Sequence, residues 1–215
     1  YGLSVCTGNT IQNDVEFKAC NWIDFETQKT QIDLLFDRFE INFVKIGLVE
    51  NWEVLNQLIN YILEKNKAIK IILDPILSAS AGFEFHEKSS EVFTSILGKI
   101  FLLTPNFNEI KQLFPDKTLK ETIEYISKKT NLYLKGGHRE KNIGKDELFT
   151  TENKHFVFNP KLKEVWEKHG SGCILSSAIT SFLALEYPMM KACYRGKKYT
   201  EKALSSNKSL LAYHG

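Results

Sequence analysis

The chain of 215 residues contains no long hydrophobic run. Apolar runs such as residues 71–73 and 101–103 fall far short of the roughly 18 residues that a membrane-spanning helix requires. The sequence also has no internal repeat and no low-complexity segment. These absences exclude a membrane-spanning protein and a repeat protein, and we expect no membrane partner.

Excess charge of one sign is also missing. Lysine and arginine together number 28 and aspartate and glutamate 26, so the formal net charge is only +2. No block of five or six like charges occurs anywhere in the sequence. Proteins that bind nucleic acid need a basic face to neutralise phosphates, so we expect no nucleic-acid partner.

Cysteine is scarce and widely spaced. The four cysteines are Cys6, Cys20, Cys173 and Cys193, and no two of them form a CxxC pair. A chain of this length with 43% apolar residues can build a core without disulfides, so we expect a reducing, cytoplasmic location. The sequence opens on Tyr1 rather than methionine, so we expect natural residues before it and leave a targeting segment open.

The apolar residues that are present alternate between two periods, one typical of strands and one of helices. Helical spacing is followed by a short β-branched run several times along the chain, which indicates βαβ crossovers and a mostly parallel sheet covered on both faces. We therefore expect one α/β domain over residues 1–215, with a short antiparallel edge. The expected strands are 3–6, 43–46, 69–73, 100–103, 132–134, 147–150 and 155–158, and the expected helices are 31–39, 53–65, 108–114, 118–129, 173–185 and 189–204.

Polar groups follow several of the expected strands. In open parallel sheets, ligands bind outside the carboxyl ends of the strands, so we expect these groups to meet in one crevice. They are residues 12–14, residues 74–75, residues 104–106 with Glu109, and residues 135–138.

The sharpest motif is His169-Gly170-Ser171-Gly172-Cys173, directly before an expected helix. Glycines at a helix start leave backbone N–H groups facing outward, where the helix dipole favours an anion such as phosphate. The same field should favour the thiolate form of Cys173. The alternative interpretation is a small-residue helix cap with a buried cysteine behind it.

Two carboxylates stand near expected strand ends. Asp74 ends an apolar strand, and Glu109 lies one turn after Asn106. Because Mg²⁺ prefers one or two carboxylates and keeps several waters, Asp74 and Glu109 could anchor this ion beside a polyphosphate. The alternatives are a turn residue before proline for Asp74, and a capping-box partner of Asn106 for Glu109.

Lys135 follows an apolar strand and precedes Gly136 and Gly137. A lysine there can reach a phosphate as a point charge, while the glycines allow the phosphate to approach the backbone. The alternative is a lysine whose stem is buried and whose ammonium reaches solvent.

Two other patterns carry little functional weight. Residues 144–146 read Gly-Lys-Asp, but Arg139 and Asp146 stand where a Walker loop needs glycine and Ser or Thr, so we expect a surface turn. The histidines show no paired i,i+4 spacing, so a zinc site has little support.

These motifs resemble the hydroxymethylpyrimidine/phosphomethylpyrimidine kinases of thiamine biosynthesis, which have the ribokinase-like fold. The resemblance runs in order along essentially the whole chain. It implies a kinase that uses ATP and Mg²⁺ to phosphorylate 4-amino-5-hydroxymethyl-2-methylpyrimidine and then the resulting monophosphate. The segments that carry it are Asp74-Pro75, residues 103–106 with Glu109, residues 134–138, and residues 169–173 followed by 176–179.

The resemblance also implies a role for each matching residue. Gln12 matches the glutamine that recognises the pyrimidine, and Asp74 and Glu109 match acidic positions near Mg²⁺ and the phosphates. The nucleotide-binding residues are Lys135, Gly136 and Gly137, and the anion hole is formed by Gly170, Ser171 and Gly172. Cys173 occupies the position that most ribokinase-like enzymes give to an aspartate base.

The family begins with a further strand and helix that touch the substrate, so the resemblance implies that the chain is N-terminally incomplete. Ribokinase-like relatives are commonly dimers, which leaves a homodimer open. Two alternatives to the pyrimidine kinase remain. One is a pyridoxal-type kinase, because its substrate is also a flat heteroaromatic alcohol, and the other is a catalytically silent nucleotide-binding protein.

Overall fold

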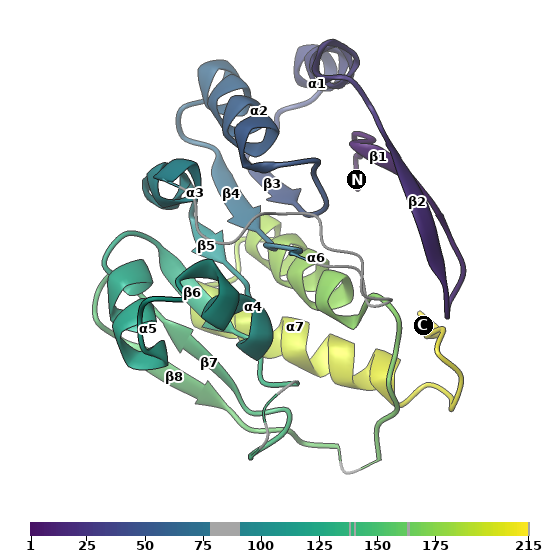
Figure 1. The fold of residues 1–215 in the computed structure, drawn as a ribbon, viewed down its shortest axis with the longest axis vertical. Helices are drawn as coiled ribbons and strands as arrows, with labels where there is room; N and C mark the ends of the chain where they lie inside the picture. The colour runs from purple at the N-terminus through teal and green to yellow at the C-terminus, as the bar shows by residue number, and fades with distance from the viewer. Residues whose placement is uncertain (78–90, 138, 140, 163, 215) are drawn as a thin grey trace.

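The computed structural model describes residues 1–77, 91–137, 139, 141–162 and 164–214. Within these ranges the strands form a six-stranded sheet of order β3-β4-β5-β6-β7-β8 and a separate two-stranded sheet, β1-β2 (Figure 1). The strands are β1 Gly8–Gln12, β2 Phe17–Trp22, β3 Phe43–Ile46, β4 Lys70–Leu73, β5 Leu102–Leu103, β6 Asn131–Leu134, β7 Asp146–Phe149 and β8 His155–Phe158. The helices are α1 Phe25–Arg38, α2 Trp52–Lys65, α3 Glu91–Ile96, α4 Phe107–Leu113, α5 Leu119–Ser127, α6 Ser171–Ala184 and α7 Met189–Leu204, with a 3₁₀ turn, η1, at Leu97–Lys99.

The large sheet has the expected mixed topology. Strands β3 to β6 pair in parallel, and β6, β7 and β8 pair antiparallel, which confirms the antiparallel edge. Helix α2 lies between β3 and β4, α3 between β4 and β5, and α4 and α5 between β5 and β6. Because these four strands run parallel, their carboxyl ends lie side by side at one edge of the sheet.

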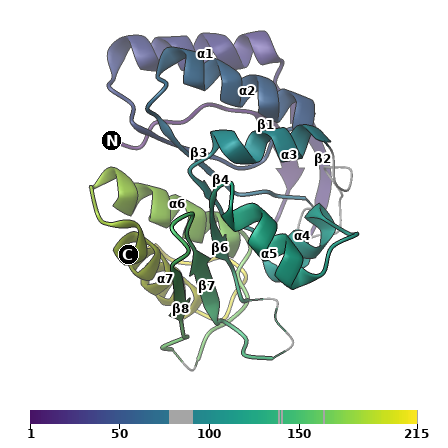
Figure 2. The same ribbon diagram turned by 90° about the vertical axis from the view of Figure 1, so that its left-hand side faces the viewer.

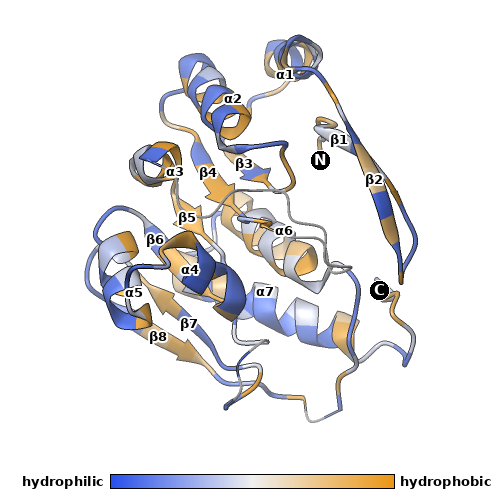
Figure 3. Cartoon of the chain, in the orientation of Figure 1, coloured by the Kyte–Doolittle hydropathy of each residue, from blue (hydrophilic) through white to orange (hydrophobic). Residues whose placement is uncertain are grey.

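The two faces of the sheet bury two different apolar cores. Along β4, Ile71 and Leu73 belong to one core and Ile72 to the other, because successive strand side chains point to opposite faces. Helices α6 and α7 cover the face of Ile72, while α2, α3, α4 and α5 lie on the opposite face (Figure 2). The apolar colour is strong in β4, β5 and β8 of the large sheet (Figure 3). The expected sheet covered on both faces is therefore confirmed.

The N-terminal region differs from the expectation. The strand expected at residues 3–6 is wrong, and the first strands are β1 and β2, which pair antiparallel outside the large sheet. Both strands consist mostly of half-buried and exposed positions, so they lack the apolar run that marks the buried strands. The short helix α3 was also missed.

Helix ends follow local capping groups more than apolar periodicity. Helix α1 begins at Phe25, six residues before the expected start, because the Asp24 side chain accepts a hydrogen bond from Thr27 N. Helix α6 begins at Ser171, with Gly170 as N-cap in the left-handed region (φ 74°). Helix α7 has the expected bounds. Across the described ranges, no helix combines the length and apolarity needed to cross a membrane.

Candidate active site

A buried lysine stands at the centre of the strand ends. Lys135 follows β6, is 8% exposed, and donates a hydrogen bond from Nζ to Asp74 Oδ1 at 2.8 Å. Its ammonium also lies 3.5 Å from Glu109 Oε2. The ammonium of Lys135 thus joins the ends of β4 and β6 to the first turn of α4. The alternative interpretation, in which this ammonium reaches solvent, is wrong.

Asp74 is held from three sides. Besides Lys135, its carboxylate accepts hydrogen bonds from Thr104 Oγ1 at 3.3 Å and from Ser176 Oγ at 2.9 Å. Ser176 lies on α6, so Asp74 connects the sheet edge to the helix that follows the glycine motif. The residue is 1% exposed, which is far more burial than a strand-end turn residue needs.

Glu109 has two structural tasks. Its Oε2 accepts a hydrogen bond from Asn106 N at 2.5 Å, and Asn106 Oδ1 accepts one from Glu109 N, so the capping box is confirmed. The same Oε2 faces Lys135. Among the described residues, no group donates a hydrogen bond to Oε1 of Glu109, so this oxygen is the one left to a ligand.

Burial and the positive charges act against each other at this cluster. Burial alone would raise the pKa of Asp74, but Lys135 and Lys45 outweigh it and hold that pKa below its usual value. Burial raises the pKa of Glu109, and Lys135 only partly offsets the rise. For Lys135, burial acts to lower the pKa, but Asp74 and Glu109 raise it above the usual lysine value. The cluster therefore contains a charged lysine and an ionised Asp74 near neutral pH.

The start of α6 supplies backbone donors next to this cluster. The first helical hydrogen bond runs from Ile174 N to Gly170 O, and Ser171 N donates to Lys168 O at 3.4 Å. Over the described part of the chain, the N–H groups of Gly172 and Cys173 have no acceptor. A Cβ at Gly172 would lie 3.2 Å from Lys135 Nζ, so the ammonium lies directly beside the first turn of α6. The ammonium of Lys135 and the open N–H groups of Gly172 and Cys173 each favour an anion beside the start of α6.

The expected thiolate at Cys173 is wrong. Burial raises the pKa of the Cys173 thiol, and the negative charge of Asp74 adds to the rise, while Lys45 and Lys135 only partly oppose it. Cys173 is a thiol near neutral pH, although it lies where the motif predicted, in the first turn of α6.

The glycine turn after Lys135 has two unlike members. Gly136 packs so closely on the backbone carbonyl of Lys145 that a Cβ could not be accommodated, whereas a Cβ at Gly137 would meet nothing within 4 Å. Only Gly137 therefore leaves the open approach that the sequence predicted for both. His138, the last residue of the motif, lies outside the described residues.

The expectation of a surface turn at residues 144–146 is wrong for Asp146. This residue is 5% exposed and accepts hydrogen bonds from Gly136 N at 2.6 Å and from Tyr133 OH at 2.8 Å. Lys197 on α7 donates to Asp146 Oδ2 at 2.9 Å and lies 3.3 Å from Glu201. A buried ion-pair network thus fixes the backbone of the glycine turn from behind, a role that no local sequence signal indicated.

Gln12 is not joined to this cluster. It ends β1 in the separate hairpin, is exposed, and donates from Nε2 to Thr10 Oγ1 at 3.0 Å. The segment before the hairpin is tied to the sheet, because Thr7 Oγ1 donates to Leu48 O at 2.6 Å just beyond β3. Three of the four polar groups expected at the strand ends therefore meet, and the group at residues 12–14 lies apart from them in the hairpin.

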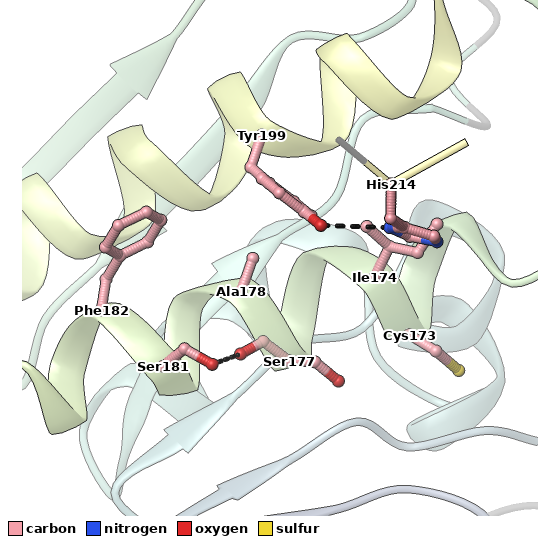
Figure 4. Close-up of a pocket in the computed structure, with 8 residues that line it drawn as sticks. All are labelled: Cys173, Ile174, Ser177, Ala178, Ser181, Phe182, Tyr199 and His214. Carbon is pink, nitrogen blue, oxygen red and sulfur yellow. Dashed lines mark hydrogen bonds between the residues drawn. The ribbon is translucent and has the colours of Figure 1, made fainter. Parts of the chain in front are cut away.

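A cavity of about 510 Å³ lies between α6, α7 and the C-terminal segment (Figure 4). Small-molecule sites commonly have this size. The cavity follows one face of α6, begins at Cys173, and is bounded on the far side by Tyr199, whose OH lies 3.1 Å from His214 Nδ1. Its lining residues are Cys173, Ile174, Ser177, Ala178, Ser181, Phe182, Tyr199 and His214.

The donor set fits Mg²⁺ better than a transition metal. The described residues contain no group of three or more His, Cys, Asp or Glu side chains placed to hold a metal ion. Mg²⁺ needs only one or two protein carboxylates, with waters and phosphates completing its shell. Glu109 offers an open oxygen for this purpose, whereas both oxygens of Asp74 already accept hydrogen bonds.

The comparisons with known proteins agree with these features. The model of the family described as phosphomethylpyrimidine kinase matches residues 1–215. A hydroxymethylpyrimidine/phosphomethylpyrimidine kinase of Aquifex aeolicus is 29% identical over 220 residues, which cover 98% of this chain and 85% of that protein. A bifunctional thiamine biosynthesis protein of Methanocaldococcus jannaschii is 29% identical over 191 residues, covering 88% of this chain, and this match spans only 43% of that relative.

Solved structures share the fold. The phosphomethylpyrimidine kinase of Clostridium difficile has a TM-score of 0.74 and 27% identity, covering 93% of this chain and 85% of that one. The pyridoxal kinase of Staphylococcus aureus in complex with ADP has a TM-score of 0.83 but 17% identity, covering 100% of this chain and 83% of that one. The second likeness concerns the fold alone.

Proposed function

The chain belongs to the phosphomethylpyrimidine kinase family, and from this premise we propose that it uses ATP to phosphorylate 4-amino-5-hydroxymethyl-2-methylpyrimidine and then the resulting monophosphate. The observation that carries the proposal is the meeting of Lys135, Asp74 and the open N–H groups of α6 at the strand ends. These groups are what phosphoryl transfer requires, because it is catalysed mainly by positioning and by neutralising charge.

In the first reaction the hydroxymethyl oxygen attacks the γ-phosphorus of ATP. The bond from this phosphorus to the bridging oxygen breaks, ADP leaves, and the hydroxyl proton is released. Cys173 would accept that proton as thiolate, and the raised pKa of its thiol makes the thiolate a minor form at neutral pH. The N–H groups of Gly172 and Cys173 would bind the transferred phosphoryl oxygens within the anion hole of Gly170, Ser171 and Gly172.

We place the nucleotide phosphates at the β6 end of the strand row. Lys135 supplies the cation there, and Gly137 leaves the backbone open to a phosphate. Gly136 contributes to the shape of this turn, because it packs closely on the backbone of Lys145 and its N–H donates a hydrogen bond to Asp146. The turn can thus keep one shape whether or not a nucleotide is present.

We propose that Glu109 holds Mg²⁺ through water. Asp74 would not bind the ion itself and would instead fix the position of Lys135 beside it. A bound Mg²⁺ would neutralise charge on the β- and γ-phosphates. The test compares Glu109→Gln with Asp74→Asn at limiting Mg²⁺. We expect Glu109→Gln to raise the Mg²⁺ concentration needed for half-maximal rate. Equal Mg²⁺ dependence in Glu109→Gln and the unmodified protein would contradict the assignment.

Gln12 is proposed to recognise the aminopyrimidine. Its amide offers one donor and one acceptor, which match the exocyclic amine and the adjacent ring nitrogen. The exposed position of Gln12 at the end of β1 leaves that amide available to a ligand on the β3 side of the site.

We also propose that residues 1–215 lie within one ribokinase-like kinase domain that acts in the cytoplasm. All four cysteines are free thiols, which suits a reducing compartment. A homodimer stays open, and sedimentation of the purified protein decides it.

A pyridoxal-type kinase is the second candidate, because pyridoxal kinases share the fold. The deciding experiment measures kcat/KM of the full-length protein for the pyrimidine alcohol and for pyridoxal, with ATP and Mg²⁺. We expect the pyrimidine to be preferred by at least about tenfold, since a polar group built to match a substrate discriminates strongly against one lacking its partner. A preference for pyridoxal would overturn the pyrimidine assignment, and no turnover of either alcohol would leave a silent binding protein.

A further inference from the structure

A second lysine faces the site from the opposite end of the strand row. Lys45 lies near the carboxyl end of β3, opposite Ile72 in the parallel register. Its neighbour Phe43, two residues earlier on the same face, packs into the core under α6 and α7. Since strand side chains alternate, Lys45 points to the face of α6, the same face from which Ser176 reaches Asp74.

Lys45 and Lys135 differ in how their charges are compensated. Lys135 is paired with both Asp74 and Glu109. Lys45 is half-buried, yet within the described ranges it has no hydrogen-bond acceptor and no ion-pair partner. A lysine ammonium held partly away from water without a partner is unfavourable, so the site has an unsatisfied preference for an anion at this point.

The position of Lys45 shows which ligand it can reach. Burial acts to raise the pKa of Asp74, and the charges of Lys135 and Lys45 are the largest of the influences that lower it, so Lys45 lies within electrostatic reach of the central carboxylate. It also acts on Cys173 at the start of α6. Its ammonium lies over Gly47, where a Cβ would come within 2.8 Å of Nζ. The ammonium therefore sits between the transfer point and the loop after β3.

That loop is the one joined to the hairpin segment. Thr7 Oγ1 bonds Leu48 O, and the segment continues into β1 with Gln12 at its end. If Gln12 binds the pyrimidine and Lys135 the nucleotide, Lys45 lies on the acceptor side of the transferred phosphoryl group. The strand order supports this division, because β4 and β5 separate β3 from β6.

Resting on the proposed function, we propose that Lys45 binds the phosphate of the monophosphate acceptor and is the residue that permits the second phosphorylation. In that step an ionised oxygen of the monophosphate attacks the γ-phosphorus, the bond to the bridging oxygen breaks, and ADP leaves, so no proton is transferred. The acceptor dianion and ATP⁴⁻ give the pyrimidine diphosphate and ADP³⁻, which balances the charge. Two anions must approach each other in this step, whereas the alcohol of the first step is neutral.

The test compares Lys45→Met with Lys70→Met in the full-length protein. Lys70 begins β4 at the opposite end of the sheet, is exposed, and lies over the rings of Phe43 and Phe101, so it is a matched lysine outside the site. Initial rates are measured separately with the purified alcohol and the purified monophosphate. Binding of the monophosphate without ATP is measured by calorimetry.

We expect Lys45→Met to raise KM and the dissociation constant for the monophosphate by about ten- to a hundredfold, as for loss of a hydrogen bond to a charged group. The loss with the alcohol should be at least about tenfold smaller, Lys45→Arg should recover much of the monophosphate activity, and Lys70→Met should change neither step. Equal losses with the two acceptors, or unchanged monophosphate binding, would overturn the inference.

Failure of the proposed function gives a different pattern. An unmodified protein that phosphorylates neither pyrimidine overturns the proposed function, and calorimetry then still decides whether Lys45 binds the monophosphate. An unmodified protein that converts the alcohol but never the monophosphate keeps the kinase assignment and overturns the role of Lys45.

Discussion

Lys135 and Lys45 stand at the carboxyl ends of β6 and β3, on two sides of the same buried carboxylate, Asp74. The β6 end is complete in itself: Lys135 is paired with two carboxylates, and Asp146 holds the following turn through a second buried ion pair. At the β3 end, Lys45 has no partner among the described residues. In the hairpin, the only hydrogen bond of the Gln12 side chain to a described residue is the one to Thr10. One end is organised before any ligand arrives, while the other offers groups that a ligand would satisfy.

This difference matches two kinds of ligand. A nucleotide presents the same phosphates in every turnover, so a fixed site costs little reorganisation. The acceptor changes from a neutral alcohol to a charged monophosphate, so the β3 end must bind two different ligands. We therefore expect substitutions at the β6 end to have larger effects than substitutions of the groups that await a ligand.

Lys135→Met should have the largest effect. Removing one partner of a buried pair costs about 3–5 kcal/mol, because Asp74 would keep a buried charge without its main counter-charge. We also expect kcat/KM to fall by roughly 10²- to 10³-fold. The free energy of unfolding is measured by urea titration, with Lys99→Met as control, since Lys99 bonds Asn56 and Asn60 away from the site.

The pH dependence of that loss has a definite sign. The lowered pKa of Asp74 contributes stability above its unfolded value near 3.9, and this contribution is lost as the pH falls through the folded pKa. Without Lys135, burial dominates and the pKa of Asp74 rises instead. The stability gap between the two proteins should therefore be wide at pH 7 and narrow near pH 3. A gap independent of pH would show that Asp74 is not the group affected.

Asp146→Asn should loosen the glycine turn from behind. Loss of the charge that Lys197 and Gly136 N contact should cost about 2–3 kcal/mol of unfolding free energy, as for hydrogen bonds to charged groups. KM for ATP should rise while KM for the pyrimidine stays nearly constant. Tyr133→Phe is the matched control, because it removes another bond to Asp146 and leaves Gly136 N in place. If both variants raise KM for ATP equally, Asp146 does not act through the turn.

Cys173→Ala should slow the alcohol step by about a hundredfold, the lower end of general-base effects, because the raised pKa leaves little thiolate at neutral pH. The monophosphate is already ionised near pH 7, since its second pKa is about 6, so its step should change far less. The rate with the alcohol should rise from pH 7 to 9 in the unmodified protein and lose this rise in the variant. Equal losses in the two steps would mean that Cys173 only shapes the anion hole.

Gln12→Ala should have the smallest effect, about a tenfold rise in KM for the pyrimidine, as for a single hydrogen-bonding group of the order of 1 kcal/mol. KM for ATP should stay nearly constant, because Gln12 lies in the hairpin outside the large sheet. Gln12→Glu keeps the shape but loses the amide donor, and it separates a recognition role from a packing role. Matching rises for pyrimidine and ATP would indicate a folding effect.

The sequence predicted the buried elements well because burial leaves a pattern. Strand β3 and helix α7 were expected with their observed bounds, and the antiparallel edge formed by β7 and β8 was expected from two short candidate strands separated by a polar turn. The hairpin β1-β2 left no such pattern, because few of its side chains are buried. Its pairing depends on backbone hydrogen bonds, which the side chains do not report.

The candidate site divides in the same way. Asp74, Glu109 and Lys135 were singled out because they end or follow apolar strands, and the structure brings them into contact. Lys45 and Asp146 were missed. A lysine inside an apolar strand looks like any edge lysine, and Asp146 appeared to belong to a polar turn, so only the tertiary contacts with α6 and α7 reveal them.

The central claim is that one site carries out both transfers. The most direct measurement follows ³¹P NMR spectra of the full-length protein with ATP, Mg²⁺ and the pyrimidine alcohol. We expect a phosphate monoester signal that appears first and then declines as the coupled pair of signals of a diphosphate ester grows, with one ADP formed for each transfer. Release of inorganic phosphate without either ester, or a monoester that accumulates and is never converted, would contradict the account.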